Sequence, residues 1–307
     1  RYTWFISMHH LICDGWTFSN MTTWVGEQYA KLEAGDDSPP EIPPFQDFVD
    51  SEMEYYRSDA CQQSGIFWDE MASDPLPEIS LYDRGVDDAN TSASCMHRHM
   101  TAESVGKMKM AIKTKAFRAF SEDQGVFLLL LTAMVVMLKR ASGNDKLSLA
   151  VCLHNRVSPQ HKISLGPFFI YSALRVDLQP DDTFSSLYKR ISGDYRRMLR
   201  HYRHPVSAPP GQRVWDATVN YVNKTFPDFA GRQTRINWLR SGAGTADELI
   251  GLQFHRFNKG GGMTAEWDFN DGIFGDDDIK LRAAHDFEAG LEFGLANPDA
   301  PLREFLD

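Results

Sequence analysis

Apolar residues follow two different periods along this chain of 307 residues, and together they predict a mixed α/β fold. Spacing typical of amphipathic or buried helices predicts helices over residues 16–33, 45–71, 103–114, 121–140, 183–203 and 276–295. Short runs rich in β-branched and aromatic residues predict strands over 2–10, 94–101, 147–153, 168–178, 217–222, 250–257 and 263–269. Helices that alternate with strands are typical of sheets covered by helices.

Local start and stop signals sharpen several of these predicted helices. Ser121 followed by two acidic residues indicates a helix start, and Gly143-Asn144 indicates its end. The apolar run 126–138 within it is shorter than the roughly 20 residues that cross a bilayer, so we expect a buried helix and no membrane span. Thr183 is a candidate N-cap, and Gly65 a candidate break in the helix over 45–71.

Residues 75–89 carry proline, glycine and aspartate and have little periodicity, so we place a boundary between two lobes there. The prediction is one lobe over residues 1–80 and a second over 81–307. A strand over 2–10 needs neighbours to pair with, and the sequence opens at Arg1. We therefore expect this chain to be part of something longer.

Composition indicates which classes of partner the protein can bind and in which cellular compartment it works. A net charge of −10 argues against a nucleic-acid partner, because phosphate neutralisation needs clustered lysine and arginine. Basic residues do gather over 190–203. We expect them to form the solvated face of a surface helix, and consider a docking face for an acidic partner the weaker interpretation. Four cysteines without a CxxC pair predict free thiols and a cytoplasmic protein.

The segment Met8-His9-His10-Leu11-Ile12-Cys13-Asp14-Gly15-Trp16 is the strongest candidate for chemistry. It reads HHxxxDG, which suits a strand that ends in a tight turn. Neighbouring residues of a strand point to opposite faces, so one histidine can do chemistry while the other packs. A histidine can accept or hold a proton near neutral pH, and the nearby aspartate could orient it.

Other polar groups have plainer explanations. A metal site at His9, His10 and Asp14 is disfavoured because the two rings diverge and helical ligand spacing is absent. His97 and His99 share a strand face, which more often means a polar face than a metal site. The glycines at 260–262 lack the GxxxxGK context of a phosphate cradle and predict a hairpin turn instead.

The motif and several later stretches, in this order, resemble the condensation domains of nonribosomal peptide synthetases and their acyltransferase relatives. The later stretches are Ile163-Ser164-Leu165-Gly166-Pro167-Phe168-Phe169, Leu174-Arg175-Val176-Asp177-Leu178 and Trp215-Asp216-Ala217-Thr218-Val219-Asn220-Tyr221. The resemblance implies the two-lobed chloramphenicol-acetyltransferase-like fold, with most of the first lobe absent from this chain. We expect this stretch alone to be inactive.

The resemblance also implies roles for the residues of the motif. It assigns the chemistry to His10 and a packing role to His9. It makes Asp14 structural rather than orienting, paired with an arginine from the other lobe, for which Arg156 is the candidate. Gly15 would allow substrate backbone to approach, and its N–H could stabilise an oxyanion.

Two further residues are candidates for the substrate channel of such a domain. They are Trp16, which follows the motif, and Asn220, although a strand asparagine satisfied by backbone explains the latter equally well.

The reaction that the resemblance implies is attack of an amine on an acyl thioester, each reactant delivered on a phosphopantetheine arm. No cofactor is then bound directly. The implied partners are carrier proteins, with adenylation domains of the same assembly line as further candidates. Two alternatives stay open. One is a standalone acyltransferase that makes an ester from an alcohol, and the other is a non-catalytic module that recruits carriers.

Overall fold

The computed structural model describes residues 2–85, 92–207, 212–239 and 249–306. Its helices are α1 (Gly15–Glu33), α2 (Gln46–Tyr56), α3 (Asp59–Ala72), α4 (Ala102–Ala111), α5 (Glu122–Ser142), α6 (Pro159–Ile163), α7 (Phe184–Met198), α8 (Asp277–Ala296) and α9 (Arg303–Leu306). Its strands are β1 (Ser80–Leu81), β2 (Arg84–Gly85), β3 (Ala93–Met100), β4 (Lys146–Leu153), β5 (Ile170–Asp177), β6 (Ala217–Val222), β7 (Ile250–His255) and β8 (Met263–Asn270). The predicted mixed α/β fold is confirmed.

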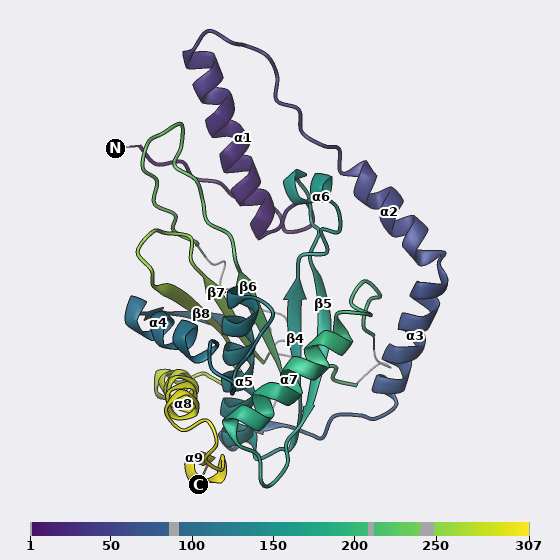
Figure 1. The fold of residues 1–307 in the computed structure, drawn as a ribbon, viewed down its shortest axis with the longest axis vertical. Coiled ribbons are helices and arrows are strands. Elements are labelled where there is room, and N and C mark those ends of the chain that lie inside the picture. The colour runs from purple at the N-terminus through teal and green to yellow at the C-terminus, as the bar shows by residue number, and fades with distance from the viewer. Residues whose placement is uncertain (1, 86–91, 208–211, 240–248, 307) are drawn as a thin grey trace.

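One six-stranded sheet organises the molecule, in the order β3-β8-β7-β6-β4-β5. Neighbours are antiparallel except for the parallel pairs β4–β6 and β6–β7. Helices α4, α5, α7 and α8 gather beside the sheet, while α1 projects from one end and α2 and α3 run along one side (Figure 1). The upper ends of β4 and β5 point towards the start of α1.

The two faces of the sheet differ in polarity because side chains alternate along each strand. One face packs on α5, α7 and α8 and contributes to the main apolar core; its central row is Val151, Val219, Leu252 and Trp267. The residues next to these along the strands point to the opposite face. That face is polar in its middle, with Asn220, Gln253 and Glu266 in register on neighbouring strands.

Helix α5 forms where its local signals predict it. The Ser121 side chain accepts a hydrogen bond from the backbone N–H of Gln124, and Gly143 ends the helix with φ +74°. By length and composition this helix could cross a membrane, but 83% of its apolar window is buried inside the fold. Helix α5 is therefore the central helix of the core, as the buried apolar run over 126–138 predicts.

The predicted strand over residues 2–10 is wrong. Residues 2–9 have no regular secondary structure, and large apolar side chains such as Tyr2 and Phe5 are exposed. A strand exists only where a neighbour supplies its ladder hydrogen bonds, and none of the described strands pairs with this segment. Its aromatic and β-branched composition alone does not make it a strand.

Two helix ends also differ from the prediction. The helix over 45–71 breaks at Arg57-Ser58 rather than at Gly65, because the Ser58 side chain caps α3 by accepting from the N–H of Cys61. Gly65 lies within α3, where an added Cβ would stand 3.2 Å from His204. Helix α7 ends at Met198 rather than near residue 203.

The division of the chain at residues 80 and 81 stays a prediction, and residues 86–89 of the expected boundary lie outside the described ranges. Part of the first segment packs on the second. The indole of Trp68 is buried in the main core and donates to the carbonyl of His201 at 3.0 Å.

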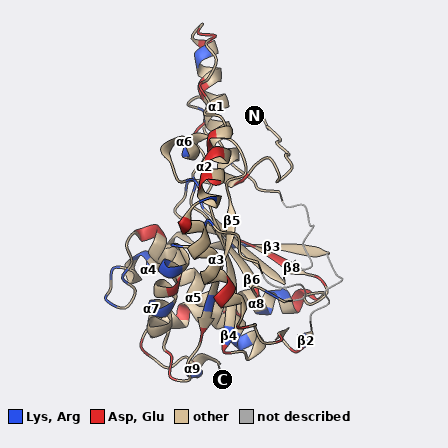
Figure 2. Cartoon of the chain, turned by 90° about the vertical axis from the view of Figure 1, so that its right-hand side faces the viewer, with Lys and Arg blue, Asp and Glu red and all other residues tan. Residues whose placement is uncertain are grey.

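The basic residues over 190–203 are largely paired with carboxylates. Arg190 binds Asp182 through both terminal nitrogens at 2.6 Å, and Arg203 binds Glu52 at 2.7 Å. Acidic and basic residues are spread over the molecule rather than gathered on one part (Figure 2). This region is therefore not a uniformly basic face.

Close packing between α7 and α8 predicts a large effect of one glycine. A Cβ at Gly294 would stand 2.2 Å from the Phe184 ring, whereas a Cβ at Gly193 would meet nothing within 4 Å. We expect Gly294→Ala to lower the free energy of unfolding by about 1–3 kcal/mol through overpacking. Gly193→Ala should raise it by about 0.5–1 kcal/mol, as alanine replaces glycine inside a helix. Urea denaturation of both variants checks this, and equal effects would contradict it.

Candidate active site at the start of helix α1

Asp14 begins helix α1 as its N-cap. With extended backbone angles (φ −133°, ψ 179°), its Oδ1 accepts from the backbone N–H of Thr17 at 2.8 Å and from the Thr17 hydroxyl at 3.0 Å. Its Oδ2 accepts from the backbone N–H of Phe168 at 3.1 Å. The carboxylate therefore joins the helix start to a loop more than 150 residues away in the sequence.

Arg156, which follows β4, supplies the charge opposite Asp14. Its Nη2 donates to both carboxylate oxygens, at 2.8 and 3.0 Å, and both side chains are buried. The expected pairing of Asp14 with Arg156 is therefore present, and it uses one nitrogen for both carboxylate oxygens. The other nitrogen, Nη1, donates to the carbonyls of His161 (2.5 Å) and Ser164 (2.9 Å). The guanidinium carbon lies 3.9 Å from the centre of the Phe168 ring. Burial lowers the pKa of Arg156, and Asp14 opposes that shift.

Gly166 closes the loop around this ion pair. Its carbonyl oxygen lies 2.7 Å from the Thr17 hydroxyl, whose single proton is shared between this carbonyl and Asp14 Oδ1, and it accepts from Arg156 Nη2 at 3.3 Å. Its φ of +145° favours glycine, and a Cβ there would stand 2.3 Å from the Phe45 ring. The loop can therefore follow this path only with glycine at this position.

The two histidines of the motif have different surroundings. Both side chains are exposed, so His9 is not packed in the interior. His9 Nδ1 accepts from the backbone N–H of Leu11 at 3.1 Å, while the His10 ring packs edge-on against Phe169, with centroids 4.7 Å apart. This difference arises in a turn rather than in the expected strand. Among the described residues, no histidine hydrogen-bonds to Asp14, so the geometry favours the structural role for that carboxylate.

The remaining predicted site residues divide into two groups. Trp16 lies beside the ion pair, with its ring 4.8 Å from that of His154. Gly15 is the first residue of α1, and an added Cβ would make ordinary contact with Val222 at 3.5 Å. Asn220 instead lies on the polar face of the sheet, where its Nδ2 donates to Gln253 Oε1 at 3.1 Å.

Sequence reasoning missed Thr17, Lys224 and the carbonyl groups that hold the guanidinium. An aspartate just before a helix is an N-cap signal, and that signal could have pointed to the bonds between Asp14 and Thr17. Lys224 places its ammonium nitrogen 3.9 Å from the centre of the Trp16 ring. Burial and the nearby Arg156 lower the pKa of this lysine. No local sequence signal indicates this contact.

Two cysteines lie near the motif, but both are held as thiols. Burial raises the pKa of Cys152 to about 12, and the charge of Asp14 acts in the same direction. Burial likewise raises the pKa of Cys13. Because the thiolate is the nucleophilic form, neither side chain is suited to form a covalent acyl intermediate.

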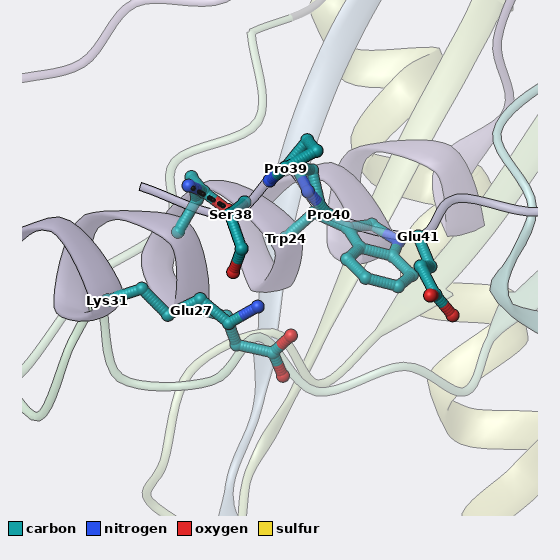
Figure 3. Close-up of a pocket in the computed structure, with 8 residues that line it drawn as sticks. Trp24, Glu27, Lys31, Ser38, Pro39, Pro40 and Glu41 are labelled. Carbon is teal, nitrogen blue, oxygen red and sulfur yellow. Dashed lines mark hydrogen bonds between the residues drawn. The ribbon is translucent and has the colours of Figure 1, made fainter. Parts of the chain in front are cut away.

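A cavity of about 410 Å³ lies outside the motif, between α1 and the segment that follows it (Figure 3). Trp24 and Lys31 of α1 line it together with Pro40 and Glu41. None of the motif residues lines this cavity, so we do not assign it to the reaction.

Comparison with known proteins gives a consistent result. The family model described as the condensation domain matches residues 1–306. The chain is 25% identical to a dimodular nonribosomal peptide synthase of Bacillus subtilis over 92% of its own length, and 26% identical to surfactin synthase subunit 1 of the same organism over 98%.

Solved structures show the same fold. The first condensation domain of the calcium-dependent antibiotic synthetase, in complex with a substrate analogue, aligns with a TM-score of 0.80 at 19% identity over 96% of this chain. The epimerization domain from the third module of tyrocidine synthetase B aligns with a TM-score of 0.72 at 14% identity over 97%. The chain spans 65% and 68% of these two structures, and 12% and 8% of the two synthases. The expected chloramphenicol-acetyltransferase-like, mixed α/β fold of condensation domains is thereby confirmed over the part that this chain spans.

The buried ion pair should dominate local stability. Asp14→Ala would leave Arg156 buried without its counter-charge, and we expect the free energy of unfolding to fall by about 3–5 kcal/mol. The exposed pair Arg232–Glu33 is the matched control, and Glu33→Ala should have a far smaller effect. A double-mutant cycle with Arg156→Met, followed by urea denaturation, isolates the coupling. A cycle that closes with no coupling energy would contradict the prediction.

The buried His161, whose carbonyl binds Arg156, predicts that the stability of the fold depends on pH. His161 is buried against Phe48 and Phe168, and burial lowers its pKa. The unfolded chain therefore binds more protons just below pH 6.5, so stability rises with pH there and is lost as the pH falls. We expect His161→Phe to reduce this slope between pH 5 and 7, and His285→Gln, at an exposed site, to leave it unchanged. An unaltered slope in His161→Phe, measured by denaturation at several pH values, would refute this origin.

Proposed function

This chain belongs to the condensation-domain family, and we propose that it serves to join an acyl group, held as a carrier-bound thioester, to an acceptor amine. The observation that supports this most is the motif geometry. The ion pair between Asp14 and Arg156 fixes the turn, and His10 remains exposed beside it. Nearby thiols are held protonated, which favours direct transfer without an acyl-enzyme.

The proposed step is attack of the amine nitrogen on the thioester carbonyl carbon. A C–N bond forms and the C–S bond breaks, so the amine loses one proton and the departing pantetheine thiolate gains one. Thioesters are already activated, and alignment of two bound reactants can contribute on the order of 7–11 kcal/mol. The protein then needs few chemical groups beyond a positioned histidine.

We assign the roles at this site as follows. His10 either takes the proton of the amine or holds the amine in place, and His9 supports the turn by accepting from the N–H of Leu11. The N–H of Gly15, at the positive end of the α1 dipole, is directed to the oxyanion of the tetrahedral intermediate. Asp14 and Arg156 are positioning residues, because their polar atoms are already hydrogen-bonded to the start of α1 and to the loop around Arg156.

Trp16 and Asn220 are assigned to the substrate channel. The Trp16 ring carries the ammonium of Lys224 on one side and lies beside His154, so it forms one wall near the motif. Asn220 stands on the polar sheet face, on β6 next to β4. The proposed lobes over 1–80 and 81–307 meet at the ion pair, since Asp14 and Arg156 come from different sides of that division.

The partners follow from the same proposal. Both reactants are expected on phosphopantetheine arms of carrier proteins. Adenylation domains are candidate neighbours in the same assembly line, and we expect the protein to act in the cytoplasm. No resident cofactor is needed for this reaction. The two named relatives are synthases, one of them a nonribosomal peptide synthase, which supports this setting.

The test uses the full coding product that contains this chain, supplied with an acyl-loaded carrier and an amine acceptor. His10→Ala should slow amide formation by about 10²–10⁴-fold, the usual contribution of a positioned acid–base group. His9→Ala, the control within the motif, should have an effect below about tenfold. Product is measured by mass spectrometry in single-turnover mixtures. Normal amide formation by His10→Ala would remove this histidine from the mechanism.

Parallel reactions separate the alternatives. An alcohol acceptor that reacts faster than the amine would indicate an ester-forming acyltransferase. Carrier binding with no acyl transfer to either acceptor would indicate a recruiting module. A pH profile that loses its acidic limb in His10→Ala would favour the base over the positioning role.

A further inference from the structure

The loop that joins α4 to α5 (Figure 1) presents apolar and basic side chains to solvent, and the proposed reaction uses none of them. Phe120 is 98% exposed, and Met110, in the last turn of α4, is 64% exposed. Lys113, Lys115 and Arg118 are exposed as well. We call these five residues the loop patch.

The three cations of the loop patch make no ion pair within the described part of the chain. Glu122, at the start of α5, is bound instead by Lys109 at 2.6 Å. The pKa of Glu122 is lowered first by the hydrogen bond from Lys109, and the charge of Lys113 contributes less. In a chain with a net charge of −10, these neighbouring unpaired cations form a local positive surface.

The loop is anchored on its inner side. Phe117 is buried and packs edge-on against Phe184 and Tyr188, and its carbonyl accepts from the Tyr188 hydroxyl at 2.9 Å. The backbone N–H of Phe120 donates to Gln124 Oε1 at 3.2 Å. A loop that is already ordered loses less conformational entropy when a partner covers it. The exposed phenylalanine is therefore presented in a form suited to contact with another molecule.

The loop patch lies at the same end of the sheet as the motif. Asp123, in the first turn of α5, accepts from Asn223 Nδ2 at 2.7 Å, just beyond the end of β6. The next residue, Lys224, contacts the ring of Trp16. The loop therefore leads into the elements that border the proposed site.

We propose that the loop patch is the docking surface for one of the two carrier proteins, through a face of the carrier that places carboxylates around an apolar residue. The cations would attract and orient the carrier, and Phe120 and Met110 would pack on its apolar residue. The small size of the patch fits a transient contact, which a carrier that leaves after each transfer requires. This inference rests on the proposed function, because it takes both reactants to arrive on carriers.

The test uses the full coding product and supplies one acyl donor in two forms, loaded on its carrier or as the small N-acetylcysteamine thioester. A second series does the same for the acceptor. Lys113, Lys115 and Arg118 are all changed to glutamate in one variant. In one of the two series this variant should raise KM for the carrier-borne form at least about tenfold, because like charges would then face each other. KM for the small thioester should not change, since it has no carrier to dock.

Two further variants test the apolar contact and the specificity of the charge effect. Phe120→Ser should raise KM for the same carrier-borne form at least about fivefold, as expected when a central aromatic contact is lost. The matched control changes three other exposed cations to glutamate, on α7 and just after it, and should leave both KM values unchanged: Lys189, Arg196 and Arg200. Thermal melting checks that each variant folds. Equal effects of the loop and control variants, or equal effects on the carrier-borne and small substrates, would overturn the proposal.

Direct binding separates failure of this inference from failure of the proposed reaction. The carrier, with its acyl group held on the arm as a stable amide, is titrated calorimetrically, and phosphatidylglycerol vesicles are titrated in parallel. Carrier binding that is lost in the charge-reversed loop variant, and restored when carboxylates of the carrier are changed to lysine, supports the surface even if no amide bond is ever formed. Amide formation with carrier binding that does not depend on the loop retains the reaction and refutes the surface. Binding of the vesicles but not of the carrier refutes it in favour of a membrane contact.

Discussion

The buried contact between Asp14 and Arg156 is the constraint on which the arrangement of the motif depends. Two opposite charges removed from water are tolerated only if their remaining polar atoms are also matched. That requirement accounts for the cap bonds from Thr17, the N–H of Phe168 and the carbonyls that face the guanidinium. The start of α1 is thereby fixed against the end of β4, and the position of His10 follows from it.

Elements defined by local interactions could be predicted from the sequence, and those defined by distant ones could not. Helix α5 has its cap at Ser121, its stop at Gly143 and an apolar run between them, all within one segment. Residues 2–9 have the composition of a strand but lack a partner among the described strands. The break near Gly65 was misplaced because a serine cap outweighs a glycine that the surrounding fold accommodates.

The candidate site shows the same limit at the level of side chains. The pairing of Asp14 with Arg156 could be expected only through the resemblance to a family, because 142 residues separate them. The acceptors around Arg156 are backbone carbonyls, which every residue has, so no residue type marks them. The polar row on the sheet was likewise invisible, since register alone brings Gln253 and Glu266 together.

The loop that surrounds Arg156 has a consequence for how such domains diverge. At His161 and Ser164 the guanidinium is held by backbone oxygens, so the side chains there can be exchanged without removing an acceptor. An insertion or deletion between these residues and Gly166 would instead displace the oxygens themselves. A change of residue type at these two positions therefore keeps the acceptors in place, whereas Gly166 and the length of the loop are both constrained. Loop length together with this glycine is a better guide to an intact site than overall residue similarity.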